Sequence, residues 1–373
     1  MQPRSIAGRL LRHGGAPPQL NLPRIITMKA LNRKERFKKL FPDEPQYRLE
    51  QVNQALFSDA KNWDEVSALP SSLRLGLEKE IPWLSVEAKQ LVWNSRQDTC
   101  KALLTANDGL IFETVLMKNK REQWTICVSS QVGCAMACTF CATGTMGLKR
   151  SLISDEIVDQ YRFWKQYLRE HPELPQRISN VVFMGMGEPT ANYESVKEAL
   201  HTWLKYTDLG LTRITVSTVG ILPVLKKILE DPEWPSVRIA ISLHSANQKR
   251  REEIVPTTVP HFLEKLKTWS HDYAKKLGNR RHHITYEYTL LNEVNDSEEL
   301  AHELAKYIRG TASSKINVIP YNPVSGKSFH RSQQERTDRF KEVLRGYDLT
   351  VTQRKTMGDD IAAACGQLVV INS

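Results

Sequence analysis

Three cysteines, Cys134, Cys138 and Cys141, stand within eight residues of one another and are the strongest chemical signal in this sequence. A closed structural zinc site requires four ligands, whereas three thiolates on a [4Fe–4S] cluster leave one iron free to bind a small molecule. The triplet therefore favours a cluster with an open position. A closed zinc site is the alternative, because Cys127 lies close enough upstream to serve as a fourth ligand.

Polar and glycine-rich motifs elsewhere in the chain follow predicted strands. They are Gly-Met-Gly-Glu-Pro at 185–189, Ser-Thr-Val-Gly at 217–220, Ser-Leu-His at 242–244 and Ile-Pro-Tyr-Asn-Pro at 319–323. Functional groups of a parallel barrel gather at the carboxyl ends of its strands, so we expect these motifs on one rim with the cysteines. Glu188 would offer a carboxylate to an ammonium group. Taken singly, Asn322 is an ordinary turn former and His244 an ordinary structural histidine.

The elements that must position these residues alternate between strands and helices from about residue 110 onward. This alternation predicts an α/β fold with a partial (β/α)6 barrel, and a doubly wound parallel sheet is the alternative. The predicted strands are 124–129, 180–184, 213–217, 238–243, 284–290 and 315–320. The predicted helices are 154–168, 193–204, 222–230, 262–276, 297–309 and 334–345.

The N-terminal part of the chain has a different pattern. Residues 28–95 carry apolar positions at helical spacing and predict a small helical accessory domain ahead of a catalytic domain over 96–373. Residues 1–27 are basic, contain no acidic residue and predict a disordered tail. Their composition resembles an organelle transit peptide, but we favour Met28 as the true start.

The overall charge is compatible with a polyanionic partner. Lys plus Arg outnumber Asp plus Glu by 52 to 42, a formal charge of +10. Single basic runs, such as Lys249-Arg250-Arg251, are equally consistent with solvated helix faces. No apolar run approaches the length of a membrane span and no secretory segment is present. We therefore expect a soluble, cytoplasmic protein whose six cysteines serve metal or redox chemistry.

Taken in this order, the motifs resemble those of the RlmN/Cfr family, the radical S-adenosylmethionine (SAM) methyltransferases of RNA adenosine. The resemblance covers roughly residues 95–370 and rests on 127–141, on GMGEP, SLH and NVIPYNP, and on GDDIAAACGQL at 358–368. It implies a radical SAM barrel whose [4Fe–4S] cluster is held by Cys134, Cys138 and Cys141. The SAM contacts that it implies are Gly187, Glu188, Ser217, Ser242, Leu243, His244 and Asn322.

The same resemblance assigns roles to two outlying cysteines. Cys365 matches the cysteine that takes a methyl group from one SAM by nucleophilic attack. A second SAM is cleaved at the cluster, the resulting radical abstracts hydrogen from that methyl group, and the carbon radical adds to the adenine ring. Glu113 matches the base that removes the ring proton, and Cys127 then releases the RNA by forming a disulfide with Cys365. A buried small hydrophobe is the alternative for each cysteine and an exposed strand residue is the alternative for Glu113, while Cys100 matches no family cysteine.

The implied substrate is an adenosine of 23S rRNA, methylated at carbon 2, with tRNA as a further substrate. GMGEP followed by Thr190-Ala191-Asn192, and RKTMGDD at 354–360, favour this branch over the carbon-8 branch linked to antibiotic resistance, which is the alternative. A zinc-stabilised RNA-binding protein is a third hypothesis. Basic residues at 118–121 and in the helical domain would contact phosphates. We further expect two SAM molecules per turnover, an electron donor such as flavodoxin or ferredoxin, a monomer, and no membrane partner.

Overall fold

The computed structural model describes residues 31–277, 284–313 and 315–370. The predicted disordered tail, 1–27, lies outside these residues. Within them, no helix has both the length and the apolar character needed to cross a membrane.

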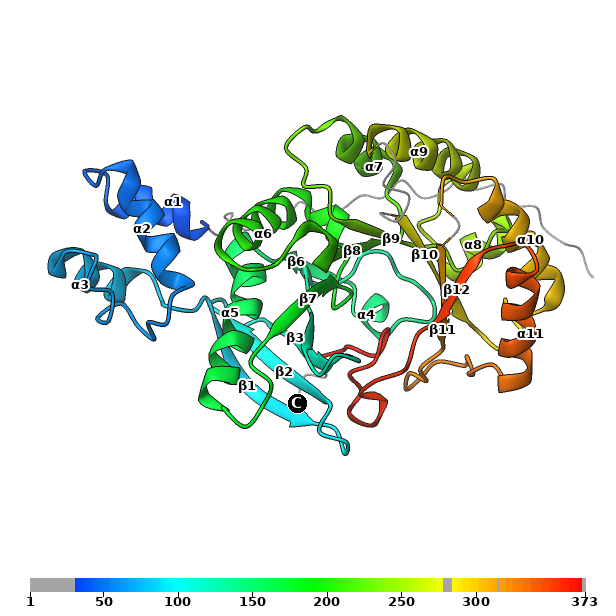
Figure 1. Ribbon diagram of the computed structural model, residues 1–373, viewed down its shortest axis with the longest axis horizontal. Helices are drawn as coiled ribbons and strands as arrows, with labels where there is room; N and C mark the ends of the chain where they lie inside the picture. The colour runs from blue at the N-terminus through cyan, green and yellow to red at the C-terminus, as the bar shows by residue number, and fades with distance from the viewer. Residues whose placement is uncertain (1–30, 278–283, 314, 371–373) are drawn as a thin grey trace, which may run out of the picture. The chain divides into compact units, whose positions relative to one another are not determined.

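Three helices at the N-terminal end of the described chain form a small cluster (Figure 1). They are α1 (Arg33–Leu40), α2 (Gln46–Leu56) and α3 (Ser71–Glu80). Asn32 begins α1 because its side chain accepts a hydrogen bond from the N–H of Glu35 at 2.8 Å, while the Glu35 carboxylate accepts from the N–H of Asn32 at 2.9 Å. The helices enclose a hydrophobic core of their own, which includes Phe37, Val52, Leu56, Trp63, Leu73 and Leu77.

A buried network of charges fastens this cluster to α5 (Ser154–Glu170). The Asp159 carboxylate accepts hydrogen bonds from the guanidinium groups of Arg33 at 2.8 Å and Arg162 at 2.6 Å, and Arg162 also donates to the carbonyl of Trp83 at 2.7 Å. Burial alone would raise the pKa of Asp159, but the charges of Arg162 and Arg33 outweigh burial and hold that pKa below its ordinary value. Asp159 is therefore an anion that joins the two cations.

One sheet of ten strands dominates the rest of the described chain. It begins with three antiparallel pairings, among β1 (Val86–Trp93), β2 (Thr99–Ala106), β3 (Ile111–Lys118) and β4 (Trp124–Cys127). From β4 onward every pairing is parallel. The parallel strands after β4 are β7 (Ile178–Phe183), β8 (Ile214–Thr218), β9 (Arg238–Ser242), β10 (Ile284–Leu290), β11 (Lys315–Pro320) and β12 (Thr350–Gln353). The predicted α/β barrel is thus confirmed, because the six predicted strands are neighbours in this row.

Helices cover the outer side of the parallel strands, while the loop that contains α4 (Ala142–Thr145) and the C-terminal segment lie on the inner side (Figure 1). The outer helices after α5 are α6 (Tyr193–Tyr206), α7 (Leu222–Glu230), α9 (Phe262–Leu277), α10 (Glu298–Arg309) and α11 (Gln334–Arg345). Strands of the parallel part are mostly buried, as expected for a sheet covered on both sides. A small hairpin of β5 (Gln131–Gly133) and β6 (Leu148–Ser151) flanks α4.

The structure adds elements that the sequence interpretation did not single out. Strands β1–β3 extend the sheet on one side, and the short strand β12 ends it on the other. The basic run that is consistent with a solvated helix face forms α8 (Gln248–Ile254), but Arg251 within it is only 1% exposed. For Arg251 the solvated reading is wrong, because its side chain turns inward toward the carboxyl ends of β8 and β9.

Candidate active site

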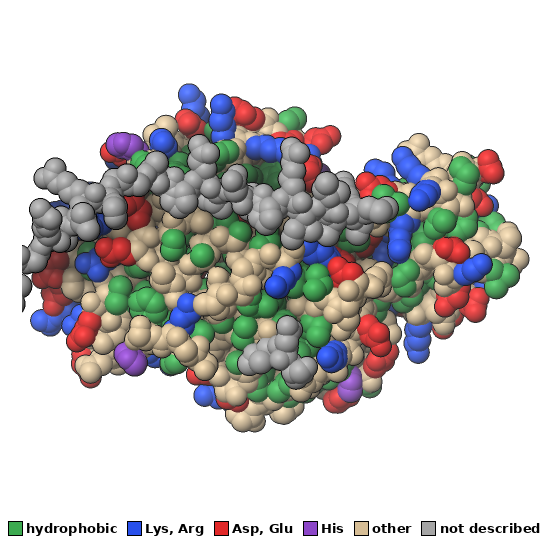
Figure 2. Space-filling view, turned by 180° about the vertical axis from the view of Figure 1, so that it is seen from behind, with side chains coloured by type: hydrophobic (Ala, Val, Ile, Leu, Met, Phe, Trp, Pro, Cys, Tyr) green, Lys and Arg blue, Asp and Glu red, His purple; other side chains and the backbone are tan. Residues whose placement is uncertain are grey.

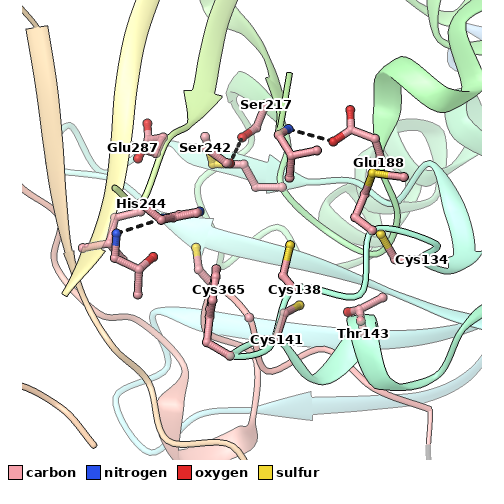
Figure 3. Close-up of a pocket in the computed structure, with 18 of the residues that line it drawn as sticks. Cys134, Cys138, Cys141, Thr143, Glu188, Ser217, Ser242, His244, Glu287 and Cys365 are labelled. Carbon is pink, nitrogen blue, oxygen red and sulfur yellow. Dashed lines mark hydrogen bonds between the residues drawn. The ribbon is translucent and has the colours of Figure 1, made fainter. Parts of the chain in front are cut away.

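A cavity of about 160 Å³ lies at the carboxyl ends of the parallel strands. Cys134, Cys138 and Cys141 all line it, as do residues in or just after each of the strands from β7 to β12. Figure 3 shows Cys138 and Cys365 pointing into the same space, across from Ser217, Ser242 and Glu188. The predicted common rim is therefore present in the structure, and we call this space the first cavity.

Backbone contacts hold the cysteine loop in place. Gly133 has φ +78, and a Cβ there would lie 1.9 Å from the carbonyl oxygen of Gly147, so a glycine is required where β5 meets the turn before β6. The N–H of Cys134 donates to the same carbonyl at 3.1 Å. Thr139 donates to the carbonyl of Ile254, at the end of α8, from its N–H at 3.0 Å and from its hydroxyl at 3.2 Å.

The three thiols fit a [4Fe–4S] cluster. All three line one cavity. Each thiolate of a cluster binds a different iron, so three thiols around one space can hold a cluster that keeps one iron open. Cys127, the fourth ligand that a closed zinc site would need, lines a different cavity.

Glu188 and Gly187 form the wall beside Cys134. Glu188 is buried, and its carboxylate accepts hydrogen bonds from the N–H of Thr190 at 3.0 Å and from the N–H of Val219 at 2.8 Å. Burial raises the pKa of Glu188, although these donors act in the opposite direction. Gly187 has φ +98, and a Cβ there would lie 2.5 Å from the Cβ of Gln131, so the backbone approaches the cavity without a side chain.

The motifs after β8 and β9 lie on the opposite part of the rim. The hydroxyl groups of Ser217 and Ser242 are 3.3 Å apart, and both residues line the first cavity. His244 lines it too, and its Nδ1 accepts a hydrogen bond from the N–H of Thr289 at 3.1 Å. Burial lowers the pKa of His244 to about 3, so the ring is neutral and carries its proton on Nε2. Leu243, by contrast, packs into the main core and does not line the cavity.

A second cavity, of about 770 Å³, lies on the other side of Cys365. Cys127, at the end of β4, lines it, and Cys365 lines both cavities. Burial raises the pKa of Cys127 to about 12, the Cys365 thiol acts in the same direction, and Arg354 acts in the opposite one. Cys127 and Cys365 thus lie together where the first cavity adjoins the second cavity.

Two predicted site residues support the C-terminal segment. Asn322 lines the second cavity, where its Nδ2 donates to the carbonyl oxygen of Cys365 at 3.1 Å. Glu113 is buried and lines neither cavity; its carboxylate pairs with Lys101 at 2.9 Å and accepts from the N–H of Val369 at 2.9 Å. The alternative of an exposed strand glutamate is therefore wrong. Burial raises the pKa of Glu113, and the charge of Lys101 opposes this shift.

Comparison with known proteins places the chain in a family. A model of the radical SAM superfamily matches residues 128–305. A ribosomal RNA large subunit methyltransferase N from Nitrosopumilus maritimus is 39% identical over 86% of this chain and 92% of its own length. The chain belongs to the RlmN family of radical SAM methyltransferases.

Other RlmN family members and a solved structure agree. A probable dual-specificity RNA methyltransferase RlmN from Aquifex aeolicus is 43% identical over 73% of this chain and 76% of its own length. A crystal structure of a radical SAM methyltransferase from Sphaerobacter thermophilus has a TM-score of 0.82 and 36% identity, and covers 91% of this chain and 97% of that one. Radical SAM enzymes use a [4Fe–4S] cluster and SAM, which matches the thiol set of the first cavity.

Three charged residues near the RlmN family motifs were not predicted as site residues. Arg354 lines both cavities, with Nη1 2.8 Å from the sulfur of Met184 and 3.6 Å from the carboxylate of Glu287. Glu287 is buried on β10 and lines the first cavity. Arg251 is buried behind the rim. In the sequence, Arg354 is marked only by the RKTMGDD motif. Glu287 has a clearer signal, because a carboxylate in the middle of an otherwise uncharged predicted strand is unusual.

Proposed function

We propose that this chain methylates carbon 2 of an adenosine in 23S rRNA, and also an adenosine in tRNA, through a methylated Cys365. The printed names of the relatives, a ribosomal RNA methyltransferase and a dual-specificity RNA methyltransferase, support RNA as the substrate. The observation that carries the proposal is the position of Cys365, which lines both the cavity of the cluster cysteines and the cavity of Cys127. A methyl carrier must reach SAM on one side and the acceptor base on the other.

The first cavity is the place for the cluster and SAM. When bound, the cluster supplies an electron for reductive cleavage of SAM, and Cys134, Cys138 and Cys141 would hold it. Gly187 and Glu188 would bind the amino acid end of SAM, Glu188 by a charge-assisted hydrogen bond to the ammonium group. The Nε2–H of His244 and the hydroxyls of Ser217 and Ser242 would donate to other polar groups of SAM. Two SAM molecules are used per turnover, because one methylates Cys365 and another is cleaved.

The second cavity is the place for the adenine. Cys365 would accept the methyl group as a nucleophile, and Cys127 would later attack its sulfur to release the methylated base. Lys118, Lys120 and Lys355 line this cavity with Arg354, and Asp98 and Glu122 line it too. The cations in this lining would contact phosphates of a nucleic acid. Where Figure 2 shows described residues, Lys and Arg side chains are interspersed with Asp and Glu.

We also propose an RNA-binding unit, an electron donor, an oligomeric state and a cellular location for the enzyme. The helical cluster of α1–α3, within the predicted accessory domain at 28–95, would bind RNA beside the catalytic domain predicted at 96–373, with cations of α1 contacting phosphates. Strand β1, which also lies within 28–95, belongs to the main sheet. An electron donor of the flavodoxin or ferredoxin type would reduce the cluster. The enzyme would act as a monomer in the cytoplasm, without a membrane partner. Glu113, as the proposed base, would have to exchange its present partners for the ring proton.

The proposal is tested by combining a trapping variant with mass spectrometry. Reconstituted enzyme, SAM, a reductant and 23S rRNA fragments or tRNA should give 2-methyladenosine at one position. Cys127→Ala should accumulate RNA covalently bound to Cys365, whereas Cys100→Ala, a buried cysteine that lines neither cavity, should turn over normally. Exclusive formation of 8-methyladenosine would place the chain in the carbon-8 branch. Absence of any covalent RNA with Cys127→Ala would refute the proposed role of Cys127.

A further inference from the structure

Arg251 is a buried cation for which the described residues offer no carboxylate partner. Its side chain is 1% exposed, and no ion pair of the described chain includes it. Burial lowers the pKa of Arg251 only to about 10, so the guanidinium is charged at neutral pH. A buried charge is costly unless an opposite charge or dipoles compensate it. The surroundings of Arg251 must therefore supply negative potential.

Part of this potential comes from the carbonyls at the ends of two strands. Arg251 donates to the carbonyl oxygens of Val219 at 2.6 Å, Leu243 at 3.1 Å and Ser242 at 3.3 Å. These carbonyls belong to the segments that carry Ser217 and His244 on the rim of the first cavity. A single guanidinium thus joins the loop after β8 to the loop after β9.

The guanidinium of Arg251 also lies 3.7 Å from the centre of the Phe262 ring, and the helix that carries it contacts the cysteine loop. Helix α8, which carries Arg251, ends at Ile254, whose carbonyl accepts both hydrogen bonds of Thr139. Cys138 and Ile254 also pack in one hydrophobic cluster. Arg251 precedes Ile254 by three residues on the same helix, so its buried charge lies within one helical turn of the residue that packs with Cys138. Between buried groups at such short range, charges interact more strongly than they do in water.

A cluster bound by three thiolates is anionic, and reduction adds one more negative charge. A fixed cation stabilises the reduced form more than the oxidised form, because the attraction grows with the charge of the cluster. We propose that Arg251 is a positioning residue that joins the two rim loops, and that its buried charge raises the reduction potential of the cluster bound by Cys134, Cys138 and Cys141. This inference rests on the cluster of the family and not on the RNA substrate proposed above.

The experiment is an anaerobic redox titration of the cluster-loaded enzyme, followed by electron paramagnetic resonance, without SAM or RNA. Arg251→Gln removes the charge and keeps a hydrogen-bonding group, and we expect the reduction equilibrium constant to fall about tenfold, which is about 59 mV for one electron. Arg251→Lys keeps the charge and should stay within about threefold of the wild type. Arg250→Gln is the matched control, because Arg250 is on the same helix but donates to the carbonyl of Val294 instead. It should leave the potential unchanged.

A second pair of variants leaves Arg251 in place, in case Arg251→Gln does not load its cluster. The hydroxyl of Thr258 accepts a hydrogen bond from Nη1 of Arg251. Thr258→Asp would set a carboxylate against the guanidinium and should lower the reduction equilibrium constant, whereas Thr258→Asn should not. An unchanged potential in both Arg251→Gln and Thr258→Asp, at full iron and sulfide content, would overturn the proposal. So would an equal fall in Arg251→Lys and Arg251→Gln, since hydrogen bonds rather than charge would then set the potential. Neither result depends on RNA methylation, which is measured separately.

Discussion

Asn322 offers a sharp test of how the catalytic segment is held. Its Nδ2 donates to the carbonyl of Cys365 at 3.1 Å, while its Oδ1 accepts from Arg331 at 3.0 Å and from the hydroxyl of Thr356 at 3.1 Å. Asn322→Ala removes all three hydrogen bonds. We expect slower methyl transfer from SAM to Cys365 and SAM affinity within about twofold of the wild type, because Asn322 lines the second cavity and not the first.

The expected magnitude follows from these contacts. A neutral hydrogen bond contributes about 1 kcal/mol and one to a charged group about 1.5–3 kcal/mol, so the three together contribute on the order of 4 kcal/mol. Only part of this acts on the position of the Cys365 sulfur, because Arg331 and Thr356 can regain water. With about 1.4 kcal/mol per factor of ten in rate, methyl transfer should slow by about 10- to 100-fold. Asn322→Asp keeps the acceptor oxygen and removes the donor, so it should slow the transfer about fivefold.

The assay follows methyl-labelled SAM into the protein under anaerobic, reducing conditions, with the mass of the Cys365 peptide as the readout. SAM binding is measured on the same preparations by equilibrium dialysis. Thr356→Val removes only the contact on the far side of Asn322 and should slow the transfer less than about threefold. The opposite pattern, in which SAM affinity drops tenfold while transfer at saturating SAM is unchanged, would refute this reasoning. It would make Asn322 the direct SAM contact that the family resemblance implies.

Three other predictions follow from the same structure. Gly187→Ala should abolish SAM binding, since its Cβ would clash with Gln131, whereas Gly210→Ala, with open space around its Cβ position, should bind SAM normally in the same dialysis assay. Asp159→Asn should lower the free energy of unfolding by about 3 kcal/mol in urea titrations at pH 7, because it leaves the buried guanidinium of Arg162 without its anion and leaves Arg33 with Asp155 alone; an effect below about 0.5 kcal/mol would contradict this. Because the pKa of Cys127 is raised to about 12, its thiol is protonated at neutral pH, and its alkylation by iodoacetamide should accelerate about tenfold per pH unit from 7 to 11. A rate that levels off near pH 9 would show that the thiol is not buried as described.

The parallel part of the fold was predictable because its signals are local. Each strand and outer helix carries its own apolar period, and the predicted helices 222–230 and 334–345 agree with α7 and α11 at both ends. Strand β12 escaped prediction, since it has four residues, two of them Thr, and little apolar character. Its place at the sheet edge depends on pairing with β11, which is a tertiary contact and leaves no period in the sequence.

The charged residues around the site were hard to predict for a different reason. Arg250 and Arg251 are adjacent and chemically identical, yet one contacts the carbonyl of Val294 near the surface and the other is buried behind the rim. On a helix, neighbouring side chains point about 100° apart, so the direction of the axis decides which of them faces the core. That direction is set by the packing of Ile254 against the cysteine loop. The sequence of a basic run therefore does not show which of its arginines is buried.

The position of Cys365 depends on hydrogen bonds from segments that are distant from it in the sequence. The carbonyl of Cys365 is held by Asn322, and the carbonyl of the next residue, Gly366, accepts a hydrogen bond from the N–H of Ala142 at 2.8 Å. The backbone is thus fixed on both sides of the Cys365 side chain, which itself is exposed to the two cavities. Under the proposed function the sulfur must meet SAM and later the base, and rotation between staggered rotamers about the Cα–Cβ bond supplies that movement without displacing the chain. A fixed backbone and free rotation about the Cα–Cβ bond of Cys365 are therefore enough for its sulfur to reach first SAM and then the base.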